Sequence, residues 1–112
     1  MSDSPLVAMT PERALASIEL TREARNRLTP LCPLPSHLGR ALDDMLRMCD
    51  DYVSDAMSFL DSGDLIRAHA AASYAHAWLD ASVRLGLADG QVMTDCSPCL
   101  DIMYGENFKN GQ

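Results

Sequence analysis

The sequence predicts an all-α fold: an up-and-down three-helix bundle at residues 10–88, followed by a short irregular or partly helical C-terminal tail. Two long segments carry apolar residues at helical spacing, and they meet at the tight turn 61–64. Aromatic residues make up only 5%, while alanine and leucine are abundant, which favours closely packed helices over strands. With 112 residues, the chain has room for one domain of ordinary size.

The first predicted helix covers residues 11–28 and follows a loose N-terminus at residues 1–9. Its start is marked by Thr10-Pro11-Glu12: a capping hydroxyl, a proline suited to the first helical position, and an acid at the positive end of the helix dipole. Arg22 and Arg25 interrupt the apolar face. We therefore expect this helix to pack less tightly than the other two.

The second predicted helix covers residues 37–60 and has a nearly complete separation of apolar and polar sides. It follows a stiff connector, because three prolines within residues 29–35 cannot continue a helix, and Ser36 supplies its N-cap. Asp43 and Arg47 form an i,i+4 pair that supports it. The apolar half of the helical wheel comprises Leu38, Ala41, Leu42, Met45, Leu46, Met48, Cys49, Tyr52, Val53, Ala56, Met57, Phe59 and Leu60. Such a separation is typical of a helix that lies on a core.

The third predicted helix covers residues 65–85 and has an apolar arc of roughly 200° on the wheel. An arc that wide must contact two neighbours, so we expect this helix to pack against both others. Asp64 caps its start, Gly86 ends it, and Leu87 can fold back on its last turn. The pattern then fades over the tail, residues 89–112.

Composition and charge exclude several classes of function. The formal net charge of −7 and the single lysine, Lys109, argue against a nucleic-acid partner. No apolar run approaches the ~20 residues of a membrane span, so we expect no membrane partner. The order of residues 1–5 is not that of a signal peptide. We therefore expect a cytoplasmic location, where the four cysteines are thiols or ligands rather than disulfides.

The two long helices carry a pattern seen in a known family. The pattern reads Tyr52-x-x-Asp55-Ala56-x-x-Phe59-Leu60-x-x-Gly63-Asp64 and then Ser73-Tyr74-Ala75-His76-Ala77-Trp78-Leu79-Asp80-Ala81-x-x-Arg84-Leu85-Gly86-Leu87. It resembles the archaeal family called domain of unknown function 357. The resemblance implies an up-and-down three-helix bundle and no established activity. It covers about half of the chain, and Ala77 departs from it, since related sequences often carry glycine there.

One helix face gathers polar side chains that could form a functional site. His69, Ser73, His76, Asp80 and Arg84 fall within roughly 80° of one another on the wheel of the third helix. His76 and Asp80 are spaced i,i+4 and could share one metal ion. His69 lies ~10 Å farther along the axis and cannot join them without distortion. The alternative is a solvated stripe in which Asp80 pairs with Arg84.

The cysteines suggest a metal site at one pole of the bundle. Cys49 falls inside the apolar arc of the second helix and is interpreted as a small core residue. Cys96-x-x-Cys99 has the spacing of half a zinc site. In an up-and-down bundle, the connector after the first helix and the end of the third helix share a pole. Cys32 and His37 could therefore complete a Cys₃His set, against the alternative of unrelated thiols.

No catalytic constellation is recognised, so we expect no enzymatic activity. The acidic edge of Asp44, Asp51 and Asp55 lacks the glycine-bearing loop of a calcium site. The sequence contains no nucleophile–base pairing, phosphate loop or dinucleotide fingerprint. HEPN ribonucleases have a similar helical hairpin, but they need an arginine four to six residues before a histidine, and that spacing does not occur here.

These observations lead to two functional hypotheses. The first is a non-enzymatic module that binds another protein or itself. The third helix is too apolar to be covered by a first helix with arginines on its inner face, which leaves apolar surface for a partner to cover. We then expect no cofactor. The alternative is a small zinc- or ligand-binding module that uses Cys32, His37, Cys96 and Cys99.

Overall fold

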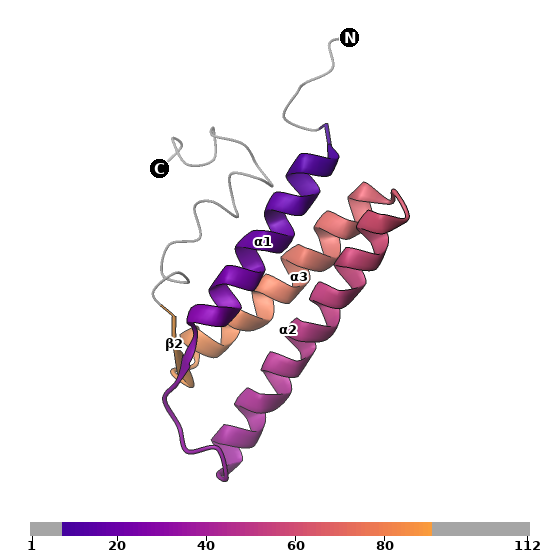
Figure 1. Ribbon diagram of the computed structural model, residues 1–112. Helices are drawn as coiled ribbons and strands as arrows, with labels where there is room; N and C mark the ends of the chain where they lie inside the picture. The colour runs from indigo at the N-terminus through magenta and orange to yellow at the C-terminus, as the bar shows by residue number, and fades with distance from the viewer. Residues whose placement is uncertain (1–7, 91–112) are drawn as a thin grey trace, which may run out of the picture.

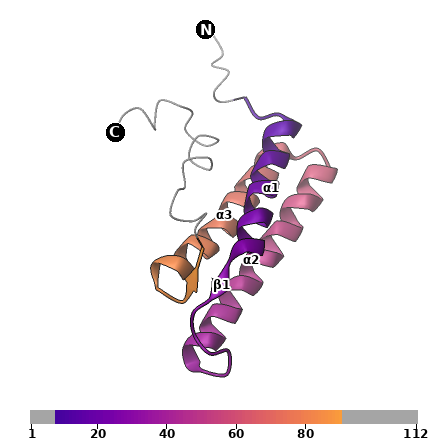
Figure 2. The same ribbon diagram turned by 60° about the vertical axis from the view of Figure 1, so that its left-hand side comes forward.

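The structure is a computed structural model that describes residues 8–90, and this part of the chain folds as an up-and-down bundle of three helices (Figure 1). The helices are α1 (Pro11–Arg27), α2 (His37–Asp61) and α3 (Leu65–Arg84). α1 and α3 run in the same direction, and α2 runs against both (Figure 2). The predicted all-α fold class is therefore confirmed.

Each helix begins at a side-chain cap that the sequence indicates. Thr10 Oγ1 accepts a hydrogen bond from the Arg13 N–H at 3.1 Å, and Ser36 Oγ accepts one from the Gly39 N–H at 3.0 Å. Asp64 caps α3 in the same way, with 3.3 Å to the Arg67 N–H. These caps satisfy backbone N–H groups that have no partner within the helix.

Two glycines in the left-handed backbone region end the long helices. Gly63 has φ 84° and Gly86 has φ 79°, a conformation that glycine adopts without steric cost. After Gly86 the chain turns back, and the Leu87 N–H donates to the Ser82 carbonyl at 3.0 Å. Leu87 is buried, as the sequence predicts for a residue folding onto the last turn.

A short antiparallel pairing closes the pole where α1 and α3 end. The strands β1 (Thr29–Pro30) and β2 (Ala88–Asp89) pair Thr29 with Asp89 and Pro30 with Ala88. The Leu31 N–H extends the pairing to the Leu87 carbonyl at 2.9 Å. The connector is thus attached to the chain that follows α3, a pairing that the sequence did not predict.

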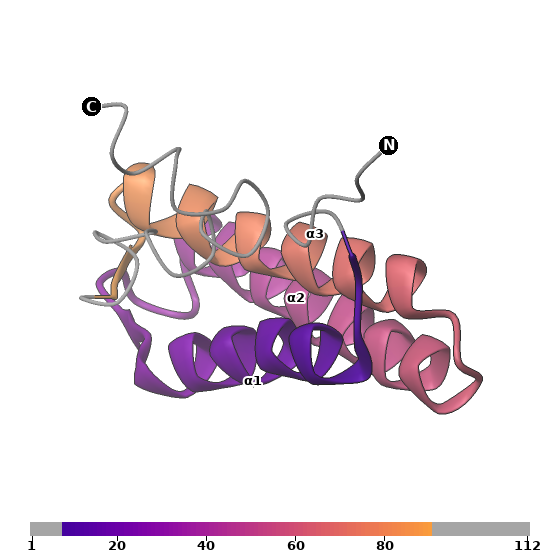
Figure 3. The ribbon, with the colours of Figure 1, turned by 90° about the horizontal axis from the view of Figure 1, so that it is seen from above.

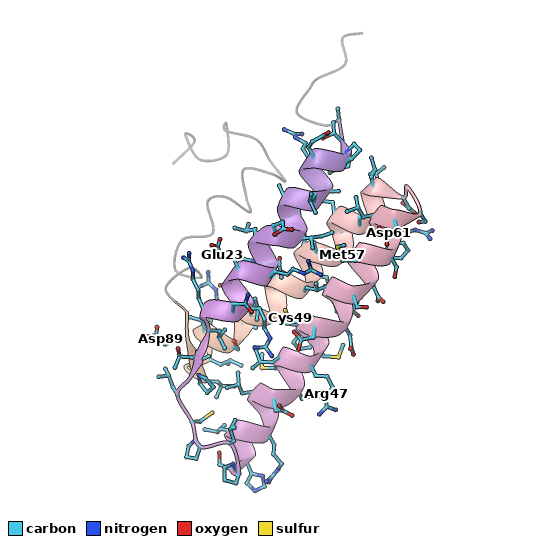
Figure 4. The ribbon with its side chains drawn as sticks, in the orientation of Figure 1. Glu23, Arg47, Cys49, Met57, Asp61 and Asp89 are labelled. Atoms are coloured by element: carbon cyan, nitrogen blue, oxygen red, sulfur yellow. The ribbon has the colours of Figure 1, made fainter. Side chains whose placement is uncertain are left out.

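α3 is the central helix of the bundle, as its wide apolar arc predicts. Its buried residues face both other helices, while α1 and α2 contact each other much less. Figure 3 shows α1 and α3 along opposite edges of the view. The core is rich in alanine, and its largest fully buried side chains include Ile18, Leu42 and Leu79. Figure 4 shows Cys49 on the inner side of α2 and Arg47 on its outer side.

The expectation that arginines occupy the inner face of the first helix is wrong. α1 buries Ala14, Ser17, Ile18, Thr21 and Ala24. These positions follow the three- and four-residue spacing of one helical face, and two of them are hydroxyl residues that an apolar-only pattern omits. Arg22 is exposed, and Arg25 forms an ion pair with Asp50 of α2 at 3.0 Å.

Candidate functional site

Two histidines of α3 lie against two hydroxyl residues of α1, forming a polar seam between these parallel helices. His69 Nδ1 lies 2.6 Å from Ser17 Oγ, and His76 Nδ1 lies 3.3 Å from Thr21 Oγ1. His76 is only 5% exposed and Thr21 1%, so the second pair is closed to solvent. Both histidines were predicted to share a face, but their contacts with α1 were not predicted.

The two hydroxyl groups also contact backbone carbonyl groups. Ser17 Oγ lies 3.2 Å from the Arg13 carbonyl oxygen, and Thr21 Oγ1 lies 3.3 Å from the Ala72 carbonyl oxygen. Each hydroxyl has one proton, which goes either to this carbonyl or to Nδ1, so the tautomer of the histidine decides which atom donates. In either tautomer the pair links α1 to α3.

Both histidines are held in the neutral form. Burial lowers the pKa of His76, and the nearby Asp80 carboxylate only partly opposes this. Burial also lowers the pKa of His69, and the Arg13 guanidinium lowers it further. In both pairs the neutral imidazole and the hydroxyl form a hydrogen bond that links α3 to α1.

The rest of the predicted polar stripe lies at the edge of this seam. Asp80 pairs with Arg84, with 2.8 Å between its carboxylate and Nε, as expected for the solvated alternative. The Oγ atom of Ser73 is buried without a hydrogen-bond partner among the described residues. The alternative of a solvated stripe is therefore wrong for His76, which is buried. The five residues of the predicted stripe do not meet at a single site.

The predicted metal site at the pole is only partly within the described residues. Cys32 is half-buried, and its thiol donates to the Leu87 carbonyl at 3.7 Å. His37 is exposed, and its Nδ1 lies 2.9 Å from an Arg40 guanidinium nitrogen. Cys96 and Cys99 lie outside residues 8–90. Within that range, no group of three or more His, Cys, Asp or Glu side chains is placed to hold a metal ion, and the Cys₃His site stays a prediction.

Cys49 belongs to the core, as predicted. It is 0% exposed and packs with Leu46 and Leu79. Burial raises the pKa of its thiol to about 12, and the neighbouring Asp50 carboxylate acts in the same direction. A thiol held protonated in this way is neither a nucleophile nor a metal ligand at neutral pH.

An open hollow lies between α1 and α2, lined by Arg22, Arg25, Asn26, Asp50 and Val53. Its volume is about 290 Å³, at the small end for a ligand site. Arg25 and Asp50 are joined across it by two hydrogen bonds, of 3.0 and 3.3 Å. The charged groups in this hollow are therefore already paired with each other, and no nucleophile lines it.

The most distinctive surface is the side of α3 that faces neither neighbouring helix. Six apolar residues form it, within about 100° of the helical wheel. We call this surface the outer face of α3, and it comprises Ile66, Ala70, Tyr74, Ala77, Ala81 and Leu85. Ile66 is 73% exposed, Tyr74 52% and Leu85 67%. On the wheel, Arg84 falls at the angle of Ile66 and Arg67 at the angle of Leu85, so the two arginines border this arc.

Aromatic residues continue the outer face toward α2. Tyr74 meets Tyr52 edge-on at 4.6 Å between ring centroids, and Trp78 lies 6.4 Å from Tyr74. Arg67 stands over the Phe59 ring at 5.9 Å. The three residues of the predicted acidic edge of α2, Asp44, Asp51 and Asp55, are all exposed. An apolar strip with aromatic residues and a charged border has the composition of a protein-binding surface.

These features define a class: a small three-helix bundle in which one buried and one half-buried histidine link α3 to α1, and in which the described residues leave an apolar face of α3 exposed. A family model described as "Protein of unknown function (DUF357)" matches residues 16–88, well over half of the chain. The chain belongs to this family. The predicted resemblance, from Tyr52 to Leu87, is thus confirmed, and the match extends through most of α1 as well.

The remaining comparisons add no relative. No curated protein and no solved structure matches the chain. Among the described residues, no helix combines the length and apolar character needed to cross a membrane.

Proposed function

We propose that this protein is a non-enzymatic interaction module that binds another protein through the outer face of α3. The observation that carries the proposal is the exposure of Ile66, Tyr74 and Leu85 along one helix face, which Arg67 and Arg84 border. Scattered exposed apolar residues are normal on a protein surface. A continuous row of them with a polar border is typical of an interface.

The rigidity of α3 supports the same function. α3 is held on one side by α1 and on another by α2, and Gly86 and the Leu87 hydrogen bond fix its end. A partner therefore meets a preformed surface, and little conformational entropy is lost in ordering it. Tyr74 and the adjoining Trp78 are residue types that often carry a large share of binding energy.

The other described sites favour binding over catalysis. The histidines at Ser17 and Thr21 serve the seam between α1 and α3, and the Cys49 thiol is held protonated in the core. The hollow beside Arg25 is small and internally paired. A chemical step needs a reactive group in a pocket, whereas the outer face of α3 is broad and chemically inert.

Matched charge substitutions test this proposal. The tagged chain is incubated with a lysate of its own organism, and captured proteins are quantified by mass spectrometry. Ala77→Glu places a carboxylate on the outer face of α3, and Ala16→Glu places the same group on exposed surface of α1. We expect at least one protein to be enriched about tenfold or more by the wild type and by Ala16→Glu, and lost with Ala77→Glu.

Two outcomes would contradict the proposal. In the first, the wild type enriches no protein, including untagged copies of itself. In the second, both variants capture the same proteins equally well. Circular dichroism of the two variants is the control for folding, since neither alanine is buried and helix content should stay the same.

A further inference from the structure

We infer that the partner of this module is a basic amphipathic helix of another protein. This helix lies along an apolar strip shared by α2 and α3 and places lysine or arginine side chains over the acidic edge of α2. The inference rests on the proposed function, because it names the chemistry of the partner that the same side of α3 binds. It is carried by the charge that borders the strip.

The strip joins the two helices of the α2–α3 hairpin. Tyr52 of α2 meets Tyr74 of α3 edge-on, and Tyr74 and Leu85 are exposed. Tyr74 and Leu85 are eleven positions apart, which gives the strip a length of ~16 Å, or about three helical turns. We call it the α2–α3 strip, and it comprises Met45, Met48, Tyr52, Tyr74, Trp78 and Leu85.

The α2–α3 strip lies on the side of the hairpin opposite α1. α1 contacts α3 at His76 and α2 at Asp50. Trp78 and Tyr52 each follow these residues by two positions, which places them about 160° away on the helical wheel. α1 therefore covers one side of the hairpin, and the described residues leave the other side open. The open side suits a second helix, with apolar residues at i, i+3, i+4 and i+7 spacing.

The acidic edge of α2 borders this strip along its whole length. On the wheel, Asp44 lies about 40° from Met48, and Asp51 and Asp55 lie within about 20° of Asp44. None of the three carboxylates forms an ion pair with a residue in the range 8–90. Asp44 and Asp55 are eleven positions apart, the same separation as that of Tyr74 and Leu85.

The arginines of α2 and α3 do not neutralise the acidic edge. Arg40 contacts His37, while Arg47, Arg67 and Arg84 each pair with an aspartate of their own helix or cap. Arg67 lies on the same side of α3 as Leu85, but it precedes Tyr74 by seven positions, ~10 Å along the helix axis. A partner on the α2–α3 strip therefore meets an apolar surface with unpaired negative charge on one border.

Charge decides between the possible occupants of the strip. A second copy of the chain has a formal net charge of −7 and brings a second acidic edge. Residues 91–112 carry three acidic side chains and one lysine. Nucleic-acid phosphates and anionic lipid headgroups are also repelled by the edge. A helix with basic residues beside its apolar face is instead attracted and oriented by it.

Binding of a synthetic peptide to the full chain tests the inference. The probe is a helix-forming peptide of about 15 residues, with leucine at i, i+3, i+4 and i+7 spacing and lysine along one side of the leucine face. Trp78 is the only tryptophan of the chain, so its fluorescence reports binding at the strip. We expect a saturable change, with the affinity falling about tenfold or more from about 0.05 to about 0.5 M NaCl. A matched peptide with glutamate in place of lysine should leave the fluorescence unchanged.

Two double variants of equal net charge locate the contact. Asp44→Asn with Asp51→Asn neutralises most of the acidic edge. Asp43→Asn with Asp61→Asn removes the same charge from exposed positions about 100° away on α2. At about 0.05 M NaCl, the dissociation constant of the lysine peptide should rise about fivefold or more for the first variant and about twofold or less for the second.

The outcomes separate this inference from the proposed function. A lysine peptide that binds the two double variants equally well, or that binds without changing the Trp78 fluorescence, is held by general charge attraction, and this overturns the inference. Equal binding of the glutamate peptide overturns it as well. A lysine peptide that does not bind, while Ala77→Glu still abolishes capture of a cellular protein, overturns the basic helix and leaves the outer face of α3 as a binding surface.

Discussion

At the level of a single residue, substitution of Leu42 tests whether its side chain belongs to the core. It is 0% exposed and packs with Leu46 and Leu79, on the side of α2 that the helical wheel predicts as apolar. Leu42→Ala should lower the unfolding free energy by about 2–5 kcal/mol, because it removes buried methyl groups and leaves a cavity. Urea denaturation followed by circular dichroism measures the change.

Leu38 provides the matched control for this substitution. It lies one turn earlier on the predicted apolar half of the same helix, but it is 58% exposed, so the prediction of a core-facing residue is wrong at this position, where α2 extends beyond the buried part of the bundle. Leu38→Ala should change the unfolding free energy by no more than about 0.5 kcal/mol. Similar losses for the two variants would contradict the orientation of α2 described above.

Residues whose environment is set by their own helix could be predicted from the sequence. The burial of Cys49 and Leu42 follows from the apolar side of α2 alone. The environment of His76 could not be predicted in this way, because it depends on Thr21, fifty-five positions earlier in the chain. The only available signal was that Ser17 and Thr21 fall on the same helical face as Ala14 and Ile18, so that a polar partner was needed opposite them.

The seam between α1 and α3 makes the stability of the bundle depend on pH. In the folded chain, the pKa values of His69 and His76 lie below the ordinary value of 6.5. The unfolded chain therefore binds more protons than the folded chain between those lowered values and about 6.5. The unfolding free energy should be highest above this range and should fall as the pH drops from about 7.5 toward 5. Denaturation midpoints across this range measure the effect.

Two substitutions separate these histidines from other titrating groups. His76→Asn keeps an amide N–H near the position of Nδ1, where it can still donate to Thr21, but does not titrate. This variant should show a smaller loss of stability between pH 7.5 and 5 than the wild type. His37→Asn, at an exposed position of α2, should retain the wild-type slope. An unchanged slope for His76→Asn would show that the pH dependence arises elsewhere, for example from His69.

At the level of whole elements, local signals were enough to place the helices. The three helices begin and end within one residue of the predicted positions, because Thr10, Ser36 and Asp64 cap their starts and Gly63 and Gly86 end the two long ones. The β1–β2 pairing was missed, because it joins two-residue segments nearly sixty positions apart and neither carries a strand pattern. Its formation depends on the bundle that brings both segments to one pole.

At the level of the whole molecule, the width of an apolar arc was the most informative feature of the sequence. The arc of α3 correctly predicted contacts with two neighbours. The leftover apolar surface was attributed to arginines on the inner face of the first helix. This reason was wrong, because α1 buries a well-defined face without arginines. The surface remains because two helices cannot cover a third all round. Its position on α3 became clear only once the sides facing α1 and α2 were known.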